Sequence, residues 1–160
     1  MRSALAKRLG PKQHYLMPGR LVLTTKPGHI ETVLGSCVAV VLFCPGRPLL
    51  GMNHIMLPGD APRNNPQPLA YAQPALRALL HRFLAYKPSE VQVKVFGGAS
   101  TWLKHEYAAV GPRILQDVET WVAHHNLQVA ATDVGGQHGR TIYARVQDAV
   151  VYRRLHTPKQ

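Results

Sequence analysis

Cys37 and His54 are the two residues of this sequence whose chemistry and spacing could combine into a nucleophile and its base. The chain between them predicts one β-hairpin, with an apolar, β-branched run over 37–44, a turn at Pro45-Gly46 and a returning run over 49–57. Antiparallel pairing about this turn sets Cys37 directly opposite His54, with Cβ atoms about 4.5–5.5 Å apart. At that separation an imidazole could take the thiol proton and leave a thiolate nucleophile. The alternative interpretation is a buried free cysteine beside a hydrogen-bonded core histidine.

The rest of the pattern predicts the elements that hold this hairpin. Apolar residues at helical spacing begin at Pro74 and end before Lys87-Pro88, and a second helical stripe covers 112–125. Apolar or alternating runs predict further strands over 21–25, 91–95, 127–132, 141–146 and 149–155. The strand over 37–44 is apolar on both faces, so both faces must be covered. We therefore expect an α/β fold, a layered α/β sandwich with mainly antiparallel strands and two main helices.

Length and cysteine content restrict the class of protein. The 160 residues suffice for one domain, which we place at 21–157, after a basic and flexible N-terminal segment over 1–20. Two cysteines seven residues apart fit neither a disulfide framework nor a zinc site. The N-terminus lacks the apolar stretch of a signal peptide, and the longest apolar run is far shorter than the roughly 20 residues of a membrane span. We expect a cytoplasmic protein with no membrane insertion.

The net charge of +11 is the strongest competing signal. Six basic and no acidic side chains lie in the first thirty residues, and such a segment attracts nucleic acid, anionic membranes or acidic proteins. A basic nucleic-acid-binding module is therefore one alternative function. Against it, Tyr15 is the one aromatic residue among those thirty, so no stacking platform results. The other interpretations of the charge are a solvated tail and a docking surface for an acidic partner.

Four motifs occur in the order typical of one protein family. They are Thr32-Val-Leu-Gly-Ser-Cys37-Val-Ala-Val, Gly51-Met-Asn-His54-Ile-Met-Leu-Pro58, Lys94-Val-Phe-Gly-Gly-Ala99 and Asp133-Val-Gly-Gly-Gln-His-Gly-Arg140. Through these motifs the chain resembles the CheD family of chemoreceptor glutamine deamidases, from about Leu21 to Leu155.

The resemblance implies an enzyme, an amidohydrolase with a cysteine nucleophile. It would hydrolyse specific glutamine side chains of bacterial chemoreceptors to glutamate, through a thioester on Cys37. His54 would be the base. Thr32 is the nearby candidate for the third catalytic residue, which orients the imidazole as the last member of a triad does.

The resemblance also suggests where a substrate would lie. Backbone amides near Ser36 and Cys37, which the approach through Gly35 and Ser36 can present, are candidates for an oxyanion hole. Gly97 and Gly98 are either turns with positive φ or places where a substrate chain approaches closely. No metal or other cofactor is expected. The implied partner is the cytoplasmic region of a chemoreceptor, with a CheC-like phosphatase as an open alternative, and nucleic acid is not expected. A non-catalytic chemotaxis adaptor that retains the fold is a third interpretation, which the sequence does not separate from an enzyme.

Overall fold

The structure is a computed structural model that describes residues 2–100 and 109–157. Its helices are α1 (Arg2–Leu9), α2 (Ala72–His81) and α4 (Val110–His124), with short 3₁₀ turns at Pro68–Ala70 and Pro88–Glu90. Its strands are β1 (Lys12–Tyr15), β2 (Leu21–Thr24), β3 (His29–Leu34), β4 (Val38–Phe43), β5 (Leu50–Asn53), β6 (Gln92–Gly97), β7 (Gln128–Val134), β8 (Arg140–Arg145) and β9 (Val151–Leu155).

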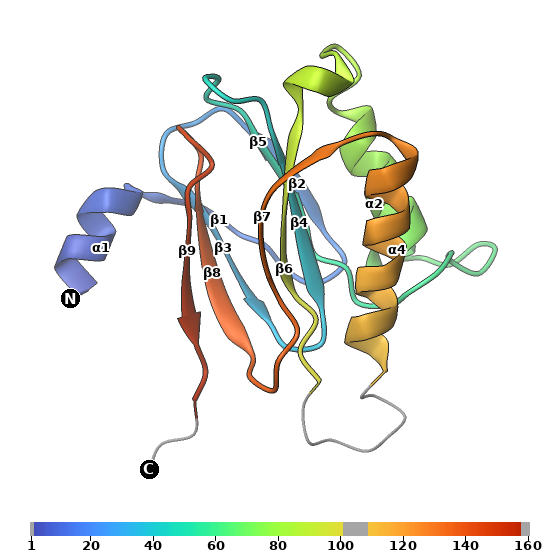
Figure 1. Cartoon of the computed structure of the whole chain (residues 1–160). Coiled ribbons are helices and arrows are strands. Elements are labelled where there is room, and N and C mark those ends of the chain that lie inside the picture. The colour runs from blue at the N-terminus through green and yellow to red at the C-terminus, as the bar shows by residue number, and fades with distance from the viewer. Residues whose placement is uncertain (1, 101–108, 158–160) are drawn as a thin grey trace.

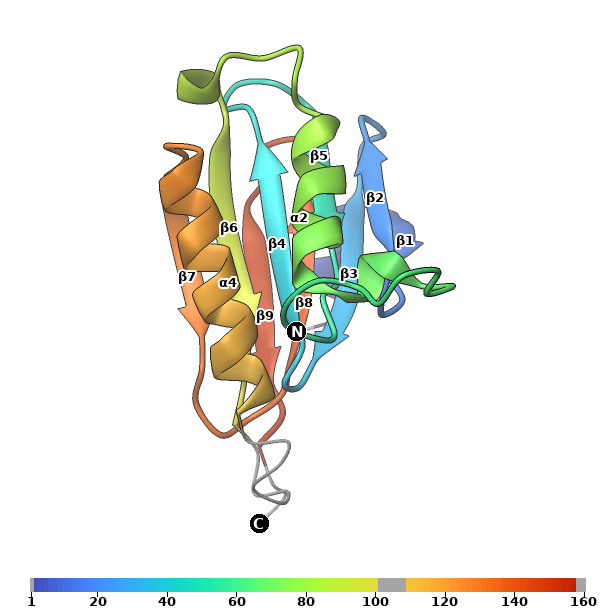
Figure 2. The same ribbon diagram turned by 90° about the vertical axis from the view of Figure 1, so that its right-hand side faces the viewer.

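Three layers make up the fold (Figure 1). A four-stranded sheet in the order β1-β3-β8-β9 forms one outer layer, and a five-stranded sheet in the order β2-β5-β4-β6-β7 forms the middle layer. Helices α2 and α4 cover the other face of the five-stranded sheet, as Figure 2 shows from that side. All the strand pairs in the described ranges are antiparallel except β1 with β3 and β6 with β7. The predicted layered α/β sandwich with two main helices is confirmed.

Strand β4 lies at the centre of the fold and is buried at every position. Ala39 and Val41 point into an apolar core between the two sheets. Val38, Val40 and Leu42 point into a second core under the helices. Both faces of β4 are apolar because the four-stranded sheet covers one face and the helices cover the other.

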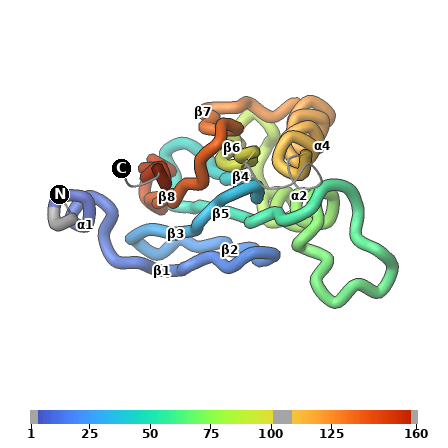
Figure 3. Tube along the Cα trace, turned by 90° about the horizontal axis from the view of Figure 1, so that it is seen from below, coloured from blue at the N-terminus to red at the C-terminus, as the bar shows by residue number. Residues whose placement is uncertain are grey.

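The segment over 1–20, which we expected to be flexible, contains a helix and a strand from Arg2 onward. Strand β1 pairs in parallel with β3 at the edge of the four-stranded sheet. Leu9 and Leu16 are buried on either side of β1 and anchor the segment to the sheets. Seen from below in Figure 3, α1 lies on the opposite side of the molecule from α2 and α4.

The hairpin of β4 and β5 is present, but its register differs by two residues from the predicted one. Phe43 pairs with Leu50, and an isolated bridge joins Val38 to Ile55. The predicted register would have paired Phe43 with Pro48, which has no N–H to donate to the ladder. Pairing therefore begins only after Pro48, and the connection is longer than the two-residue turn that the sequence suggested.

Candidate active site

Cys37 and His54 lie on neighbouring stretches of chain, just before β4 and just after β5. The pairing of Val38 with Ile55 corrects the prediction that Cys37 stands directly opposite His54. The difference of two residues keeps both side chains on the same face of the sheet, because side chains alternate with a period of two. They are diagonal neighbours, a relation in which two residues lie roughly 7–8 Å apart and their Cβ atoms are somewhat closer. That face points toward the four-stranded sheet, where Cys37 packs against the core between the sheets.

Thr32 joins the two sheets at His54. Its side chain extends from β3, and Oγ1 lies 2.8 Å from Nδ1 of His54 and 2.7 Å from the carbonyl oxygen of Leu16. A hydroxyl has one proton to donate, and the Leu16 carbonyl can only accept. Thr32 therefore donates to Leu16 and accepts the Nδ1–H of His54. This assigns the neutral imidazole a proton on Nδ1 and a lone pair on Nε2.

Nε2 of His54 is buried and has no hydrogen-bond partner in the described part of the chain. The side chain as a whole is almost fully buried, with 1% of the residue exposed. Burial lowers the pKa of His54 to about 4, against the smaller opposing effect of the nearby backbone carbonyl of Leu16. The imidazole is therefore neutral at pH 7, with an unoccupied lone pair, as a general base requires.

Cys37 is partly exposed and is a free thiol. Burial raises its pKa above the ordinary value of a thiol. The free protein thus holds a neutral thiol beside a neutral imidazole. Its second cysteine, Cys44, is buried at the tip of the hairpin, away from His54.

The loop that carries Cys37 presents its backbone amides to solvent. Gly35, Ser36 and Cys37 are all partly exposed. Neither the N–H of Ser36 nor that of Cys37 donates a hydrogen bond to any group in the described ranges. These two amides are free to donate to a developing oxyanion on a carbon bonded to Cys37, and an oxyanion hole there stays a prediction.

Gly97 and Gly98 lie directly beneath this loop. The N–H of Gly98 donates to the Cys37 carbonyl over 2.8 Å, so this amide is not available to a substrate. A Cβ on Gly97 would lie 2.2 Å from that same carbonyl oxygen, and its φ of +101° already favours glycine. In the structure the two glycines let β6 pass close under Cys37, and contact with a substrate stays a prediction for them.

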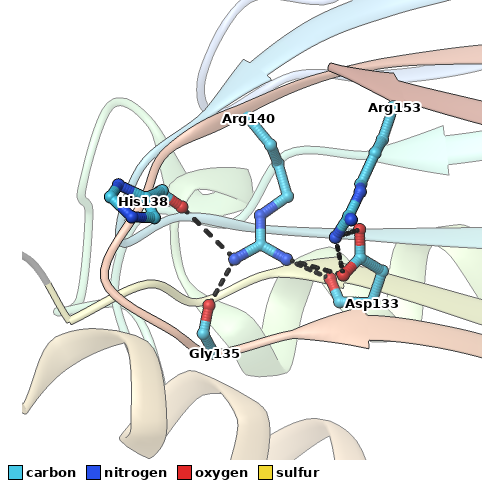
Figure 4. A network of polar contacts seen from close by, with 5 residues as sticks. All are labelled: Asp133, Gly135, His138, Arg140 and Arg153. Carbon is cyan, nitrogen blue, oxygen red and sulfur yellow. Dashed lines mark hydrogen bonds and ion pairs between the residues drawn. The ribbon is translucent and has the colours of Figure 1, made fainter. Parts of the chain in front are cut away.

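A buried arginine organises the loop between β7 and β8 (Figure 4). Arg140, with 2% of the residue exposed, donates to the backbone carbonyl and carboxylate of Asp133 and to the carbonyl of Gly135. Arg153 from β9 donates to the same carboxylate at 2.8 and 2.9 Å. Both terminal nitrogens of Arg140 are occupied by these groups, whereas its buried Nε has no hydrogen-bond partner in the described ranges, and the contacts of Arg140 hold this loop together. The sequence placed Asp133 and Arg140 in one motif, but no signal in it pointed to Arg153.

The loop that Arg140 holds is connected to the Cys37 loop through the end of β6. The N–H of Gly135 donates to the carbonyl of Gly97 over 2.8 Å, and the N–H of Ala99 donates to the carbonyl of Gly35 over 3.0 Å. The loops that contain Gly35, Gly97 and Gly135 are therefore hydrogen-bonded to one another at one end of the molecule, and Cys37 lies in the first of them.

Two cavities of the structure lie beside this end rather than at Cys37. One of about 450 Å³ lies between α4 and β7 and is lined mainly by apolar side chains. Another of about 200 Å³ is lined by the loop that Arg140 holds. Within the described ranges no group of three or more metal-ligating side chains occurs. No helix in those ranges is both long and apolar enough to cross a membrane.

Comparisons with known proteins agree with the four sequence motifs. The family profile described as CheD chemotactic sensory transduction matches residues 56–154. The probable chemoreceptor glutamine deamidase CheD of Pseudomonas savastanoi pv. phaseolicola is 33% identical over 95% of this chain and 89% of its own length. Its namesake in Methanococcus maripaludis is 32% identical over 85% and 90%, and the probable chemoreceptor glutamine deamidase CheD 2 of Geobacter sulfurreducens is 35% identical over 81% of both chains. The chain belongs to the CheD family.

Proposed function

We propose that this protein hydrolyses glutamine side chains of a chemoreceptor to glutamate, with Cys37 as nucleophile and His54 as base. The substrate class comes from the names of the relatives, which are probable chemoreceptor glutamine deamidases. One observation supports the chemistry above all. The hydrogen bond from Nδ1 of His54 to Thr32 leaves the lone pair on Nε2, on the sheet face that Cys37 shares.

The reaction has two halves. In the first, Sγ of Cys37 bonds to the carboxamide carbon while Nε2 of His54 takes the thiol proton. The oxyanion that forms accepts hydrogen bonds from the amides of Ser36 and Cys37. His54 then returns its proton to the departing nitrogen, the C–N bond breaks, and ammonia and a thioester result.

In the second half a water molecule attacks the thioester. His54 takes a proton from the water as its oxygen bonds to the carbonyl carbon. The C–S bond breaks, the proton passes from His54 to the sulfur, and glutamate leaves while the Cys37 thiol is restored. Thr32 touches no reacting atom in this scheme and acts as a positioning residue for the imidazole.

The test is intact-mass spectrometry of a receptor cytoplasmic fragment incubated with the protein. Each modified site should add the mass difference between an amide NH₂ and a hydroxyl. Cys37→Ala should abolish the change and keep the fold, whereas Cys44→Ala, a matched loss of a buried thiol, should keep the activity. Equal activity in wild type and Cys37→Ala would disprove the proposed mechanism.

The two alternative functions give different results in the same assay. A non-catalytic adaptor would bind the receptor fragment without changing its mass. A nucleic-acid-binding module would bind random DNA tightly and leave the receptor unchanged. The proposal also keeps three predictions from the sequence, namely one catalytic domain over 21–157, a cytoplasmic location and a CheC-like phosphatase as a second partner.

A further inference from the structure

The outer face of the four-stranded sheet carries a row of tyrosines. Tyr15 of β1 pairs with Glu31 of β3, Glu31 pairs with Tyr143 of β8, and Tyr143 pairs with Tyr152 of β9. Three of the six tyrosines of the chain therefore lie in one line across four strands. Tyr15 has 47% of its surface exposed, and the other two are half-buried.

The next row, toward Cys37, consists of Val33, Thr141 and Arg154, which are paired across β3, β8 and β9. Thr141 is buried and its hydroxyl lies 2.8 Å from Nε2 of His156, so the exposed residues of this row are Val33 and Arg154. Val33 is 41% exposed, although the alternate residues of β3 are buried between the sheets. The side chain of Arg154 is exposed and has no ion-pair partner in the described part of the chain. We call these two rows together the tyrosine face.

Cations hold the tyrosine rings in place. Nζ of Lys12 lies 5.9 Å from the centre of the Tyr15 ring, and the guanidinium of Arg145 lies 5.7 Å from that of Tyr152. Tyrosines that are partly exposed, next to an arginine without an ion-pair partner, are the composition that protein interfaces favour. Helices α2 and α4 leave these two rows uncovered, since both lie on the far side of the five-stranded sheet (Figures 1 and 2).

Charge decides which partner fits the tyrosine face. The net charge of +11 opposes the approach of a second copy and favours an acidic partner. Glu31 lies within the row, between Tyr15 and Tyr143, and pairs with Lys12 over 2.8 Å, so the row itself offers no free cation to the phosphates of a nucleic acid stacked on the rings. A protein segment that sets apolar side chains on the tyrosines and an acidic side chain on Arg154 satisfies both conditions.

The tyrosine face leads to the candidate active site along β3. Glu31 and Val33 point outward, and Thr32 between them points inward to His54. From Glu31 to Cys37 the chain advances six positions, which span up to about 20 Å in a strand. A bound segment would cover this distance with about six residues if extended, or about 13 if helical.

We propose that the tyrosine face docks an acidic stretch of the receptor chain that lies within about 20 Å of the glutamine to be modified. This proposal rests on the proposed function, because it names a second contact with the same substrate. Docking there raises the affinity for the receptor without contributing a group to the chemistry. Its signature is an effect on KM and Kd that leaves kcat unchanged.

The experiment compares the double variant Tyr152→Thr, Arg154→Glu with the control Arg82→Glu. Threonine keeps the strand preference of β9, and Arg82 at the end of α2 offers the same charge reversal on the opposite side of the molecule. For a receptor cytoplasmic fragment, KM of the double variant should rise about tenfold, as the loss of interface anchors does. Its kcat and the KM of the control should match those of the wild type. A short peptide that carries only the target glutamine should be modified equally by all three proteins.

Binding separates failure of the docking proposal from failure of the proposed function. The Kd for the receptor fragment, measured by fluorescence anisotropy with Cys37→Ala proteins, should rise about tenfold in the double variant whether or not the fragment is ever deamidated. An unchanged Kd and KM would overturn docking and leave the deamidase proposal intact. A different partner would give another result. If the double variant loses DNA binding or self-association and its Kd for the receptor fragment is unchanged, the docking proposal is overturned, and DNA or a second copy of the chain is the partner of the tyrosine face.

Discussion

Replacement of Thr32 with valine tests the geometry of the candidate site most directly. Valine keeps the shape of threonine and removes only the hydroxyl that joins the Leu16 carbonyl to Nδ1 of His54. Thr32 is fully buried, so no solvent replaces the lost partner. With Nδ1 unpaired, the imidazole proton is free to move to Nε2, and the lone pair then faces the methyl groups of the introduced valine instead of Cys37.

The magnitudes follow from the two lost hydrogen bonds. Each buried polar group left without a partner costs about 1–3 kcal/mol, so the two predict a loss of about 2–6 kcal/mol in the free energy of unfolding. A general base contributes about 10²–10⁴-fold to a rate. Because the base would carry its proton on the wrong nitrogen for most of the time, we expect kcat to fall about 10- to 1000-fold.

The assay pairs Thr32→Val with Thr32→Ser. Serine keeps the hydroxyl and both hydrogen bonds, and loses one methyl group at a cost of roughly 1 kcal/mol. Urea unfolding gives the stability of each variant, and the initial rate of receptor-fragment deamidation is measured where circular dichroism shows the variant folded. The reasoning fails if Thr32→Val keeps the kcat of the wild type, or if Thr32→Ser loses as much activity as Thr32→Val.

Three further predictions concern the groups around Thr32. The first concerns His54, whose pKa is about 4 in the folded protein and about 6.5 in the unfolded chain. Between about pH 4 and pH 6.5, His54 is therefore protonated in the unfolded chain and neutral in the folded protein. The free energy of unfolding therefore falls as the pH is lowered through this window. Measured by urea unfolding, its loss between pH 7 and pH 4 should be about 3 kcal/mol larger in the wild type than in His54→Gln. Equal losses would contradict the burial argument. Alkylation of Cys37 by iodoacetamide should follow an apparent pKa above that of an ordinary thiol, because burial raises the pKa of Cys37; a lowered value would show a resting thiolate instead. Gly97→Ala should destabilise the fold and displace Cys37, because the added Cβ would lie 2.2 Å from the Cys37 carbonyl oxygen. In the control Gly35→Ala the added Cβ meets nothing within 4 Å, so this variant should fold as the wild type. Circular dichroism and urea unfolding would check both results.

The sequence predicted the right face for the candidate catalytic pair and the wrong register. Alternation of side chains depends only on parity, so an error of two residues left Cys37 and His54 on one face. The register itself depends on where the first ladder hydrogen bond forms after the turn. Pro48 decides this locally, because it has no N–H, and Phe43 pairs with Leu50 instead.

Contacts between the sheets could not be predicted in the same way. Thr32 reaches His54 only because β3 lies across from the end of β5, in a different sheet. The carbonyl of Leu16 fixes the Thr32 hydroxyl, and a backbone group leaves no trace in a residue pattern. Strand β1 is only four residues long and mostly exposed, so it lacks the alternation that marks a half-buried strand. Helix α2 ends at His81, before the predicted Lys87, because the next backbone bonds have the tighter 3₁₀ spacing.

The pKa values of the pair indicate when the thiolate forms. Burial lowers the pKa of His54 to about 4 and raises the pKa of Cys37 above that of an ordinary thiol. Both shifts oppose transfer of the proton from Cys37 to His54 in the free protein. A stable ion pair at rest is then disfavoured, and in the proposed mechanism the proton moves as sulfur bonds to the carboxamide carbon. The negative charge would then pass directly to the substrate oxygen, and we expect the unpaired amides of Ser36 and Cys37 to affect the rate most after the pair itself.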